Sequence, residues 1–399
     1  MESEVVAIPG VHEGLPQGWR WLPLAEVADN LDNKRKPINA AERETRKGDV
    51  PYYGATGQVG WIDKHLLDEE VVLVGEDGAP FLEPGRPKAY MISGKSWVNN
   101  HAHILRARDG MPNAYLMHFL NILDYSPYVT GTTRLKLTKG AMNKIPVPVA
   151  PLPQQRRIVE AIELQLGRLD AAVARLHAAK AKLKRYRQAV LKAAVEGPLL
   201  KGDYSWVTIE EASERIVDCL HSTPKFTEYG KYCIDTTCIE QGKIRFDKAR
   251  FVSEESFTER IRRLKPEAGD ILFAREGTVG TTVVVPEDVD LCLGQRMMMF
   301  RLKKFVVPKF FMYVMQSAII VDKYRPLIMG TTAPHLNIRD IRKFTLPEYP
   351  MPLQQQIVAR LDEIFEVLRE QEFTLDTQLA HSTRLRQSVL KRAFEGRLV

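Results

Sequence analysis

Short polar segments of the sequence concentrate the side-chain types that bind nucleic acids. One segment is Asn33-Lys-Arg-Lys-Pro-Ile-Asn39, and another is Tyr52-Tyr-Gly-Ala-Thr-Gly-Gln58. Arg, Lys, Asn and Gln can form paired hydrogen bonds with base edges, while Thr hydroxyls and backbone N–H groups bond phosphates. We interpret these segments as DNA-contacting loops; the alternative is that each is an ordinary solvated surface.

A Gly-Thr-Thr loop occurs twice, which favours the DNA-contacting interpretation. Gly131-Thr-Thr-Arg-Leu-Lys136 matches Gly330-Thr-Thr-Ala-Pro-His335, 199 residues later. In the first half of the chain, the candidate DNA-contacting residues are Lys34, Arg35, Lys36, Tyr53, Thr56, Gln58, Asn100, His101, Thr132, Thr133, Arg134 and Lys136. In the second half they are Thr223, Lys225, Arg275, Thr278, Gln295, Arg296, Thr331, Thr332 and His335.

The sequence carries no complete catalytic motif. Gly94-Lys-Ser96 resembles the end of a phosphate-binding P-loop, but that motif needs glycine where Ala89 stands. Gly-x-Gly-x-x-Gly, His-Glu-x-x-His, Gly-x-Ser-x-Gly and Asn-Pro-Pro-Tyr are all missing from the sequence. His101 and His103 alternate along a predicted strand, but no neighbouring ligands complete a metal set, so a structural or DNA-facing role is favoured. We therefore expect no catalytic residues and no metal site.

Length and composition predict a soluble cytoplasmic protein of two or three domains. The 399 residues are 44% hydrophobic and 27% charged, with a net charge of +7. The longest apolar stretch, 310–321, is too short to span a bilayer, and the first residues are acidic, unlike a secretory signal. The four cysteines (219, 233, 238 and 292) are expected to be reduced thiols.

The chain contains an internal repeat. Residues 151–159 match 350–358, and residues 187–197 match 386–396, both at an offset of 199. Trp21–Glu26 also resembles Trp206–Glu211, at an offset of 185, so the two halves begin and end alike around dissimilar middles.

Each half ends in a predicted long helix. We expect the helices to begin at Pro153 and Pro352 and to end at Gly197 and Gly396, acting as left-handed C′ residues. Apolar residues recur every seven positions, which predicts a coiled coil. The first helix is basic toward its end and the second is acidic toward its start, so charge favours antiparallel pairing.

The predicted class is α+β, with two mixed α/β domains joined by an antiparallel two-helix coiled coil and a pseudo-two-fold internal repeat. The expected divisions are 1–150, 151–197, 198–349 and 350–399. Strands are expected at 71–74, 102–105, 270–273 and 297–300, and helices at 114–123 and 308–321.

These features resemble the specificity (S) subunit of Type I restriction-modification systems, over nearly the full chain. The helix starts at 151–159 and 350–358 and the helix ends at 190–192 and 389–391 are similar to its central and distal conserved regions. Residues 52–57, 137–138 and 336–337 resemble parts of its target-recognition domains. The sequence departs from the commoner family pattern at Gln154 and Leu353, where Glu usually stands.

The resemblance implies a subunit that is not itself an enzyme. Each domain would read one half of an asymmetric bipartite site in double-stranded DNA, and the helices would act as a spacer. Two methylation (M) subunits would dock on one copy of this chain to form an adenine-N6 methyltransferase, and motor-nuclease (R) subunits would then join. No cofactor is expected in this chain, because S-adenosylmethionine, ATP and Mg would belong to the partner subunits. Neither a coiled-coil adaptor that binds only protein nor a self-contained methyltransferase is excluded by the residues.

Overall fold

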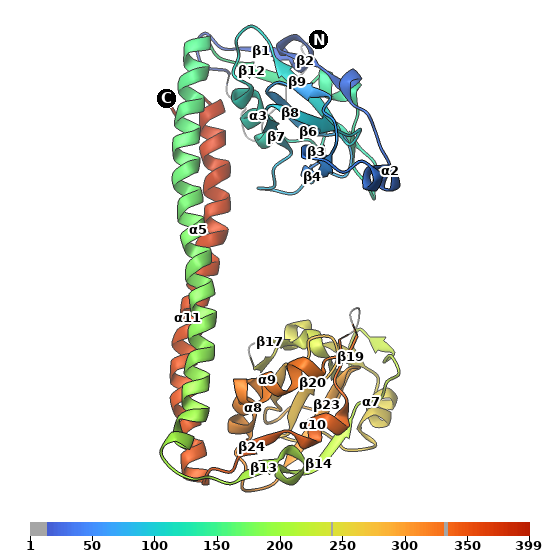
Figure 1. Ribbon diagram of the computed structural model, residues 1–399, viewed down its shortest axis with the longest axis vertical. Helices are drawn as coiled ribbons and strands as arrows, with labels where there is room; N and C mark the ends of the chain where they lie inside the picture. Colours follow the sequence, from blue (N-terminus) through green and yellow to red (C-terminus); the bar gives the residue numbers. More distant parts are fainter. Residues whose placement is uncertain (1–13, 241, 331–333) are drawn as a thin grey trace. The chain divides into compact units, whose positions relative to one another are not determined.

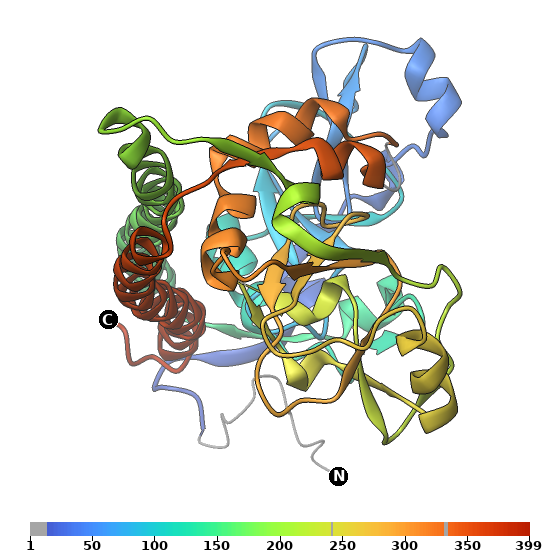
Figure 2. The ribbon, with the colours of Figure 1, turned by 90° about the horizontal axis from the view of Figure 1, so that it is seen from below.

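The computed structural model describes residues 14–240, 242–330 and 334–399. These residues form two compact units, which share the long helices α5 (Leu152–Glu196) and α11 (Met351–Phe394). Unit 1 contains the described residues up to Ala178 together with Leu375–Val399, and unit 2 is Ala179–Thr374. Figures 1 and 2 show the two helices lying side by side.

The helices pack in antiparallel fashion, as predicted. In unit 1, Ile158 near the start of α5 belongs to the same buried cluster as Phe394 at the end of α11. In unit 2, Val195 at the end of α5 clusters with Ile357 near the start of α11. Apolar contacts of this kind supply most of the stability of a paired helix.

A repeated glutamine explains how both helices begin. The Gln155 amide donates to the carbonyl of Ala150 over 2.8 Å, and the Gln354 amide donates to the carbonyl of Tyr349 over 2.7 Å. Both side chains are buried and their positions differ by 199 residues. The repeated glutamine at the helix starts therefore fixes the chain that enters each helix.

The helix ends differ from each other, and one prediction was wrong. Gly396 has φ of 69°, and the N–H of Arg397 bonds the carbonyl of Arg392, so it is the left-handed end that we expected. Gly197 instead continues into a 3₁₀ turn, Gly197–Leu200. Pro198 follows it, and the fixed φ of proline suits the first turn of such a helix.

Unit 1 contains two four-stranded sheets. The first has the order β2 (Ala28–Asn30), β9 (Ala102–Ala107), β6 (Val71–Gly75), β7 (Ala89–Ile92). The second has the order β4 (Gly57–Ile62), β3 (Val50–Gly54), β8 (Lys95–Val98), β5 (Leu67–Asp68). The chain enters and leaves through an antiparallel pair, β1 (Arg20–Pro23) and β12 (Pro146–Val149).

Unit 2 repeats this plan. Its sheets have the orders β14 (Ser213–Asp218), β23 (Met297–Leu302), β20 (Ile271–Ala274), β21 (Thr282–Val284), and β15 (Phe226–Thr227), β19 (Arg250–Val252), β16 (Lys231–Ile234), β22 (Leu291–Leu293). The entry pair is β13 (Trp206–Thr208) and β24 (Thr345–Pro347). Most pairings are antiparallel, but β3–β8 and β16–β22 are parallel, a feature that the sequence pattern did not indicate.

One helix in each unit packs the sheet against the long helices. In unit 1 it is α3 (Asn113–Ile122), whose Phe119 ring lies 5.6 Å from that of Phe394. In unit 2 it is α8 (Pro308–Gln316), and the helix predicted at 308–321 breaks at Ser317 before α9 (Ala318–Tyr324). Of the helices in the described ranges, none is long and apolar enough to cross a membrane.

Candidate nucleic-acid interface

In unit 1, three segments that are distant in sequence meet at the loop after the central strand β6. This loop, Glu76–Gly78, is called the β6 loop below. The N–H of Glu76 donates to the carbonyl of His101 over 2.7 Å, and the N–H of Leu137 donates to the carbonyl of Glu76 over 2.7 Å. The end of the Gly-Thr-Thr loop is thus held against the residues that precede β9.

These two backbone hydrogen bonds are called the frame below. Unit 2 has the same frame after its strand β20, at the β20 loop (Arg275–Gly277). The N–H of Arg275 donates to the carbonyl of Arg296 over 3.0 Å, and the N–H of Leu336 donates to the carbonyl of Arg275 over 2.9 Å. Glu76 and Leu137 correspond to Arg275 and Leu336 at an offset of 199. His101, which precedes β9, corresponds to Arg296, which precedes β23, at an offset of 195.

The side chains on the two frames differ in charge and shape. Glu76 corresponds to Arg275 and His101 to Arg296, while Lys136 corresponds to His335. Carboxylates accept hydrogen bonds from cytosine amino groups, and Arg donates two bonds to guanine. One backbone design therefore presents two chemically distinct surfaces.

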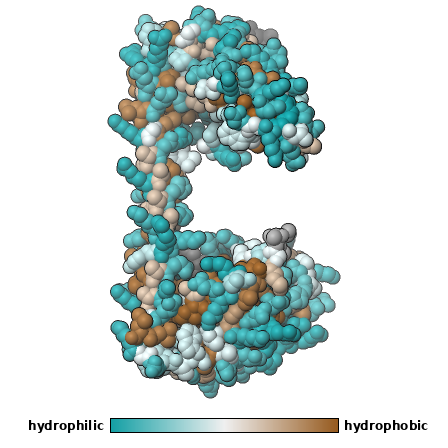
Figure 3. All heavy atoms as spheres, in the orientation of Figure 1, coloured by the Kyte–Doolittle hydropathy of each residue, from teal (hydrophilic) through white to brown (hydrophobic). Residues whose placement is uncertain are grey.

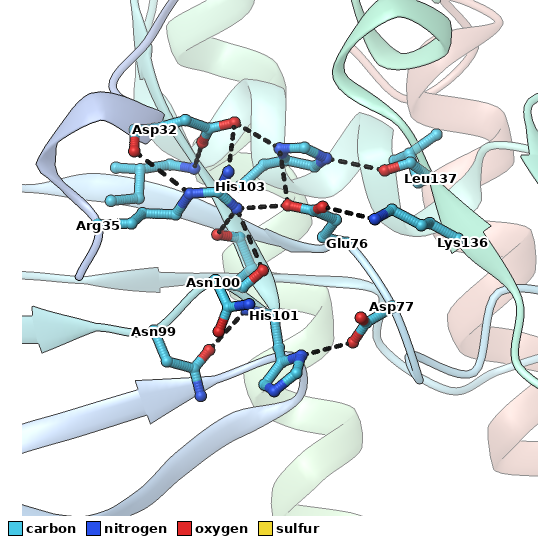
Figure 4. A network of polar contacts seen from close by, with 12 residues as sticks. Asp32, Arg35, Glu76, Asp77, Asn99, Asn100, His101, His103, Lys136 and Leu137 are labelled. Atoms are coloured by element: carbon cyan, nitrogen blue, oxygen red, sulfur yellow. Dashed lines mark hydrogen bonds and ion pairs between the residues drawn. The ribbon is translucent and has the colours of Figure 1, made fainter. Parts of the chain in front are cut away.

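In unit 1, Arg35 lies at the centre of a polar network (Figure 4). Its guanidinium contacts the Glu76 carboxylate at 2.5 Å and the Asp32 carboxylate at 3.2 Å, and it donates to the carbonyl of Ala102 over 3.0 Å. The Arg35 side chain is only 16% exposed. Arg35 is thus placed to position the loop rather than to project from it.

His103 is buried behind this arginine. Its Nδ1 lies 2.7 Å from a carboxylate oxygen of Asp32, and its Nε2 lies 2.9 Å from the carbonyl oxygen of Leu137. Burial raises the pKa of Asp32, but the hydrogen bond and charge of His103 and the N–H of Ile104 outweigh it, so the pKa falls below its ordinary value. The buried face of the network is therefore fixed by charge as well as by packing.

The exposed basic side chains of this network contact acidic residues. Arg134 and His101 both contact the Asp77 carboxylate at 2.7 Å, and Lys136 lies 3.2 Å from the Glu76 carboxylate. Burial raises the pKa of Glu76, but hydrogen bonds from Arg35 and Lys136 outweigh it and the pKa is lowered. Both signs of charge are thus presented at one surface.

In unit 2, Arg275 is the buried anchor. Its guanidinium bonds the Asp218 carboxylate at 2.9 and 3.1 Å and contacts Glu276 at 2.9 Å. The Gln295 amide donates to the carbonyl of His221 over 2.6 Å and to the hydroxyl of Thr223 over 3.1 Å. These bonds tie the loop before β23 to the loop after β14.

Arg296 is the exposed cation of the same frame. Its backbone has φ of 68°, in the left-handed region that residues other than glycine rarely occupy. Strain of this kind persists where surrounding structure holds it, often at binding sites. Among the described residues, Arg296 forms no ion pair.

The other candidate residues lie farther from these contacts. Lys34 pairs with Glu69 at 2.7 Å, and Tyr53 is half-buried beside Tyr90. The remaining candidates with described surroundings are exposed, namely Lys36, Thr56, Gln58, Asn100, Thr132, Thr133, Lys225 and Thr278. Thr331 and Thr332 lie outside the described residues.

Sequence reasoning missed the acidic partners, Asp32, Glu76, Asp77 and Asp218. A signal was available, because Glu76 and Asp77 follow a buried strand directly, as Arg275 does in the second half. Within the described ranges, His, Cys, Asp and Glu residues form no group of three or more that could hold a metal ion.

The two arginines of unit 1 should respond differently to truncation. We expect Arg35→Ala to destabilise this unit by about 3 kcal/mol, because it removes the guanidinium that two mostly buried carboxylates, Asp32 and Glu76, share. Arg134→Ala should cost less than about 1 kcal/mol, because the side chain is 60% exposed. Hydrogen exchange of the β6 and β9 amides measures the stability of this unit alone. Equal protection in the two variants would contradict the positioning role of Arg35.

Comparisons with known proteins point in one direction. A sequence profile of the Type I restriction modification DNA specificity domain matches residues 16–181 and again residues 200–374. The chain is 28% identical over 363 residues to a putative type I restriction enzyme specificity subunit of Haemophilus influenzae, spanning 87% of this chain and 88% of that protein. It is 22% identical over 427 residues to the type I restriction enzyme EcoKI specificity subunit of Escherichia coli, spanning 96% and 90%.

A solved structure shares the fold. It comes from work on complex assembly and conformational transition of the type I R-M system, and it matches with a TM-score of 0.69. The match covers 96% of this chain and 100% of the other chain at 19% identity.

Proposed function

This chain belongs to the Type I restriction modification DNA specificity family, and from that premise we propose that each of its two target-recognition domains reads one half of a bipartite DNA site. The proposed functional divisions are 1–150 and 198–349 for recognition, with 151–197 and 350–399 as the helical spacer. The chain itself has no catalytic activity in this proposal.

The observation that carries this proposal is the shared backbone frame with unlike side chains. The β6 and β20 loops are held by the same backbone hydrogen bonds, yet His101 and Lys136 stand where the second unit has Arg296 and His335. Base edges are read by side-chain hydrogen bonds, so different groups on one frame select different bases. The two half-sites should therefore differ in sequence.

In each unit, the buried members of the frame position the exposed ones. Arg35 and Arg275 hold acidic residues and backbone in place, and the exposed candidates named above contact bases or phosphates. The carboxylates of Glu76 and Asp77 prevent the first domain from being a simple cationic surface, which favours selective over general binding of the phosphate backbone.

Apolar side chains exposed on the helix pair support a second role, the docking of protein partners. Tyr186 and Val367 of unit 2 are 55% and 50% exposed, and Leu164 and Leu385 of unit 1 are 57% and 42% exposed. Tyr186 and Leu385 are equivalent at the 199-residue offset. Figure 3 shows apolar and hydrophilic residues together along the helices.

Exposed apolar side chains in both units, with Tyr186 and Leu385 at equivalent positions, suit two copies of one partner. We therefore assign them to two methylation subunits, which would supply S-adenosylmethionine and the adenine-N6 transfer. Motor-nuclease subunits using ATP and Mg would then join the assembly.

Removing the exposed arginine of unit 2 tests base reading by one domain. Arg296→Gly deletes the side chain while glycine accommodates the left-handed backbone. We expect methylation of sites with the correct second half-site to fall by roughly ten- to a hundredfold, the worth of one bidentate base contact. The assay is methylation of a DNA library with randomised half-sites, using the complex with methylation subunits.

The matched control is Arg134→Ala in unit 1, which should alter selection at the other half-site only. If either variant weakened methylation equally for all sequences, the arginine would be a phosphate contact. An adaptor that binds only protein would show no salt-dependent affinity for duplex DNA. Measuring that affinity therefore distinguishes the adaptor from a DNA-reading subunit. Methyl transfer by the chain alone would support the self-contained enzyme.

A further inference from the structure

In unit 1, α3 packs against the long helices, and in unit 2, α8 packs against them in the same way; each of these helix contacts is called a joint below. The two joints can be compared position by position. β9 and β23 begin 195 residues apart, and the following helices α3 and α8 also begin 195 residues apart. The long helices correspond at an offset of 199. His118 therefore corresponds to Tyr313, and Leu166 corresponds to Phe365.

In unit 2 this joint is filled. The Tyr313 hydroxyl donates to the Asp362 carboxylate over 2.5 Å, and the Lys309 ammonium lies 2.7 Å from the same carboxylate. The Phe365 ring packs edge-on against Tyr313 at 5.4 Å, and the Arg187 guanidinium lies 3.8 Å from the centre of the Phe365 ring. Two aromatic rings, one carboxylate and two cations satisfy one another.

In unit 1 the same joint contains a cavity of about 470 Å³. Smaller residues replace the aromatic ones: His118 and Leu166 line the cavity, and Ala114 stands where unit 2 has Lys309. Two of the three charged groups remain, because Glu163 corresponds to Asp362 and Arg386, which pairs with Asp170, corresponds to Arg187. The cavity thus keeps one carboxylate and one guanidinium of the filled joint without its rings.

One buried polar group of the cavity is unsatisfied. Nε2 of His118 is buried without a hydrogen-bond partner among the described residues. Burial and the nearby charge of Arg386 lower the pKa of His118 to about 4, so its ring is neutral at physiological pH. The Glu163 carboxylate lines the cavity from an exposed position, and Ala114 and His118 stand where its counterpart has the donors Lys309 and Tyr313. A buried polar group without a partner, such as Nε2 of His118, calls for a ligand or an explanation.

We propose that this cavity binds a phenolic ring, supplied by a tyrosine side chain of a partner protein. The ring would occupy the space that Tyr313 and Phe365 fill in unit 2, against Leu166 and within reach of the Arg386 guanidinium. The phenolic hydroxyl would donate to Glu163, as Tyr313 donates to Asp362. The volume lies within the usual range for sites that enclose a small organic group. This site is separate from the DNA-facing loops.

Binding of p-cresol and toluene to the full chain tests the proposal by titration calorimetry. We expect one p-cresol site per chain, with an affinity roughly tenfold or more above that of toluene, because the hydroxyl bonds a charged acceptor. Glu163→Gln should reduce this preference. N-acetyl-L-tyrosinamide should bind and N-acetyl-L-leucinamide should not.

Two variants locate the site. Leu166→Phe places in the cavity the ring that unit 2 carries, and should lower p-cresol affinity by about tenfold or more. Gln165→Phe adds the same ring at an exposed position nearby, and should leave binding unchanged. The proposal is overturned if p-cresol does not bind, or binds Leu166→Phe as well as the parent chain. Binding of p-cresol without N-acetyl-L-tyrosinamide would assign the cavity to a free phenol and overturn the partner tyrosine.

Discussion

Deleting one heptad from each long helix is expected to shorten the unread spacer of the DNA target. The segments to remove are 174–180 of α5 and 373–379 of α11, which are equivalent at the 199-residue offset. Seven residues span about 10.5 Å of helix, the rise of about three base pairs. If the helices act as a spacer, the two half-sites must then lie closer together.

The same deletion should also slow methylation. A heptad is close to two full helical turns, so removing it changes the rotation of one recognition domain about the helix axis very little. Half-sites that are three base pairs closer are turned by roughly 100° around the duplex, and the DNA must twist to meet both domains. We therefore expect a spacer shortened by about one to three base pairs and a reduced rate.

Methylation mapping of genomic DNA reads the spacer directly. Deletion of 174–180 alone is the control, because it shifts the apolar seam of one helix against the other. That control should abolish assembly or methylation at all sites. Methylation at the original spacer by the double deletion would refute the spacer role.

The sequence was sufficient to predict the helices because their signal is local and repeated. Pro153 and Pro352 lie in the first turn of α5 and α11, and the antiparallel pairing expected from charge is confirmed. Gly197 was misassigned because a glycine near a helix end permits a left-handed residue without requiring one. The following Pro198 indicates a 3₁₀ turn after the helix, because its fixed φ suits the first turn of such a helix.

The candidate interface was predicted only in part, for a physical reason. The Gly-Thr-Thr loops could be found by repetition, but the acids that position them could not. Glu76, His101 and Leu137 become neighbours through strand pairing between segments 25 to 61 residues apart. No local pattern reports such pairings, so Arg35 was interpreted as a base-reading candidate although its guanidinium is held by Asp32 and Glu76.

A chain with two copies of the first domain should recognise the same half-site at both ends of its target. The entry strands provide matched junctions, because Trp21 pairs with Pro148 as Trp206 pairs with Pro347. Residues 206–347 would be replaced by a copy of residues 21–148. If each domain reads its own half, the second half-site must change to match the first.

The helix surface at the second joint must be adapted to the grafted domain. Phe394 of α11 packs against Tyr115 at 5.1 Å in unit 1, and its equivalent in unit 2 is Val195. Val195→Phe restores that ring, and Phe365→Leu supplies the counterpart of Leu166. Without these changes, the loss of buried aromatic contact could cost several kcal/mol, about 3–5 for a complete Phe truncation.

The direct measurement of the central claim is the methylated sequence produced by this grafted chain with its methylation subunits. Co-purification of the subunits verifies that the chain has folded and assembled. We predict that every methylated site carries the first domain's half-site twice, and that the second domain's half-site is gone. Continued methylation of the original asymmetric target would show that the domains do not read the half-sites separately, and would contradict the account.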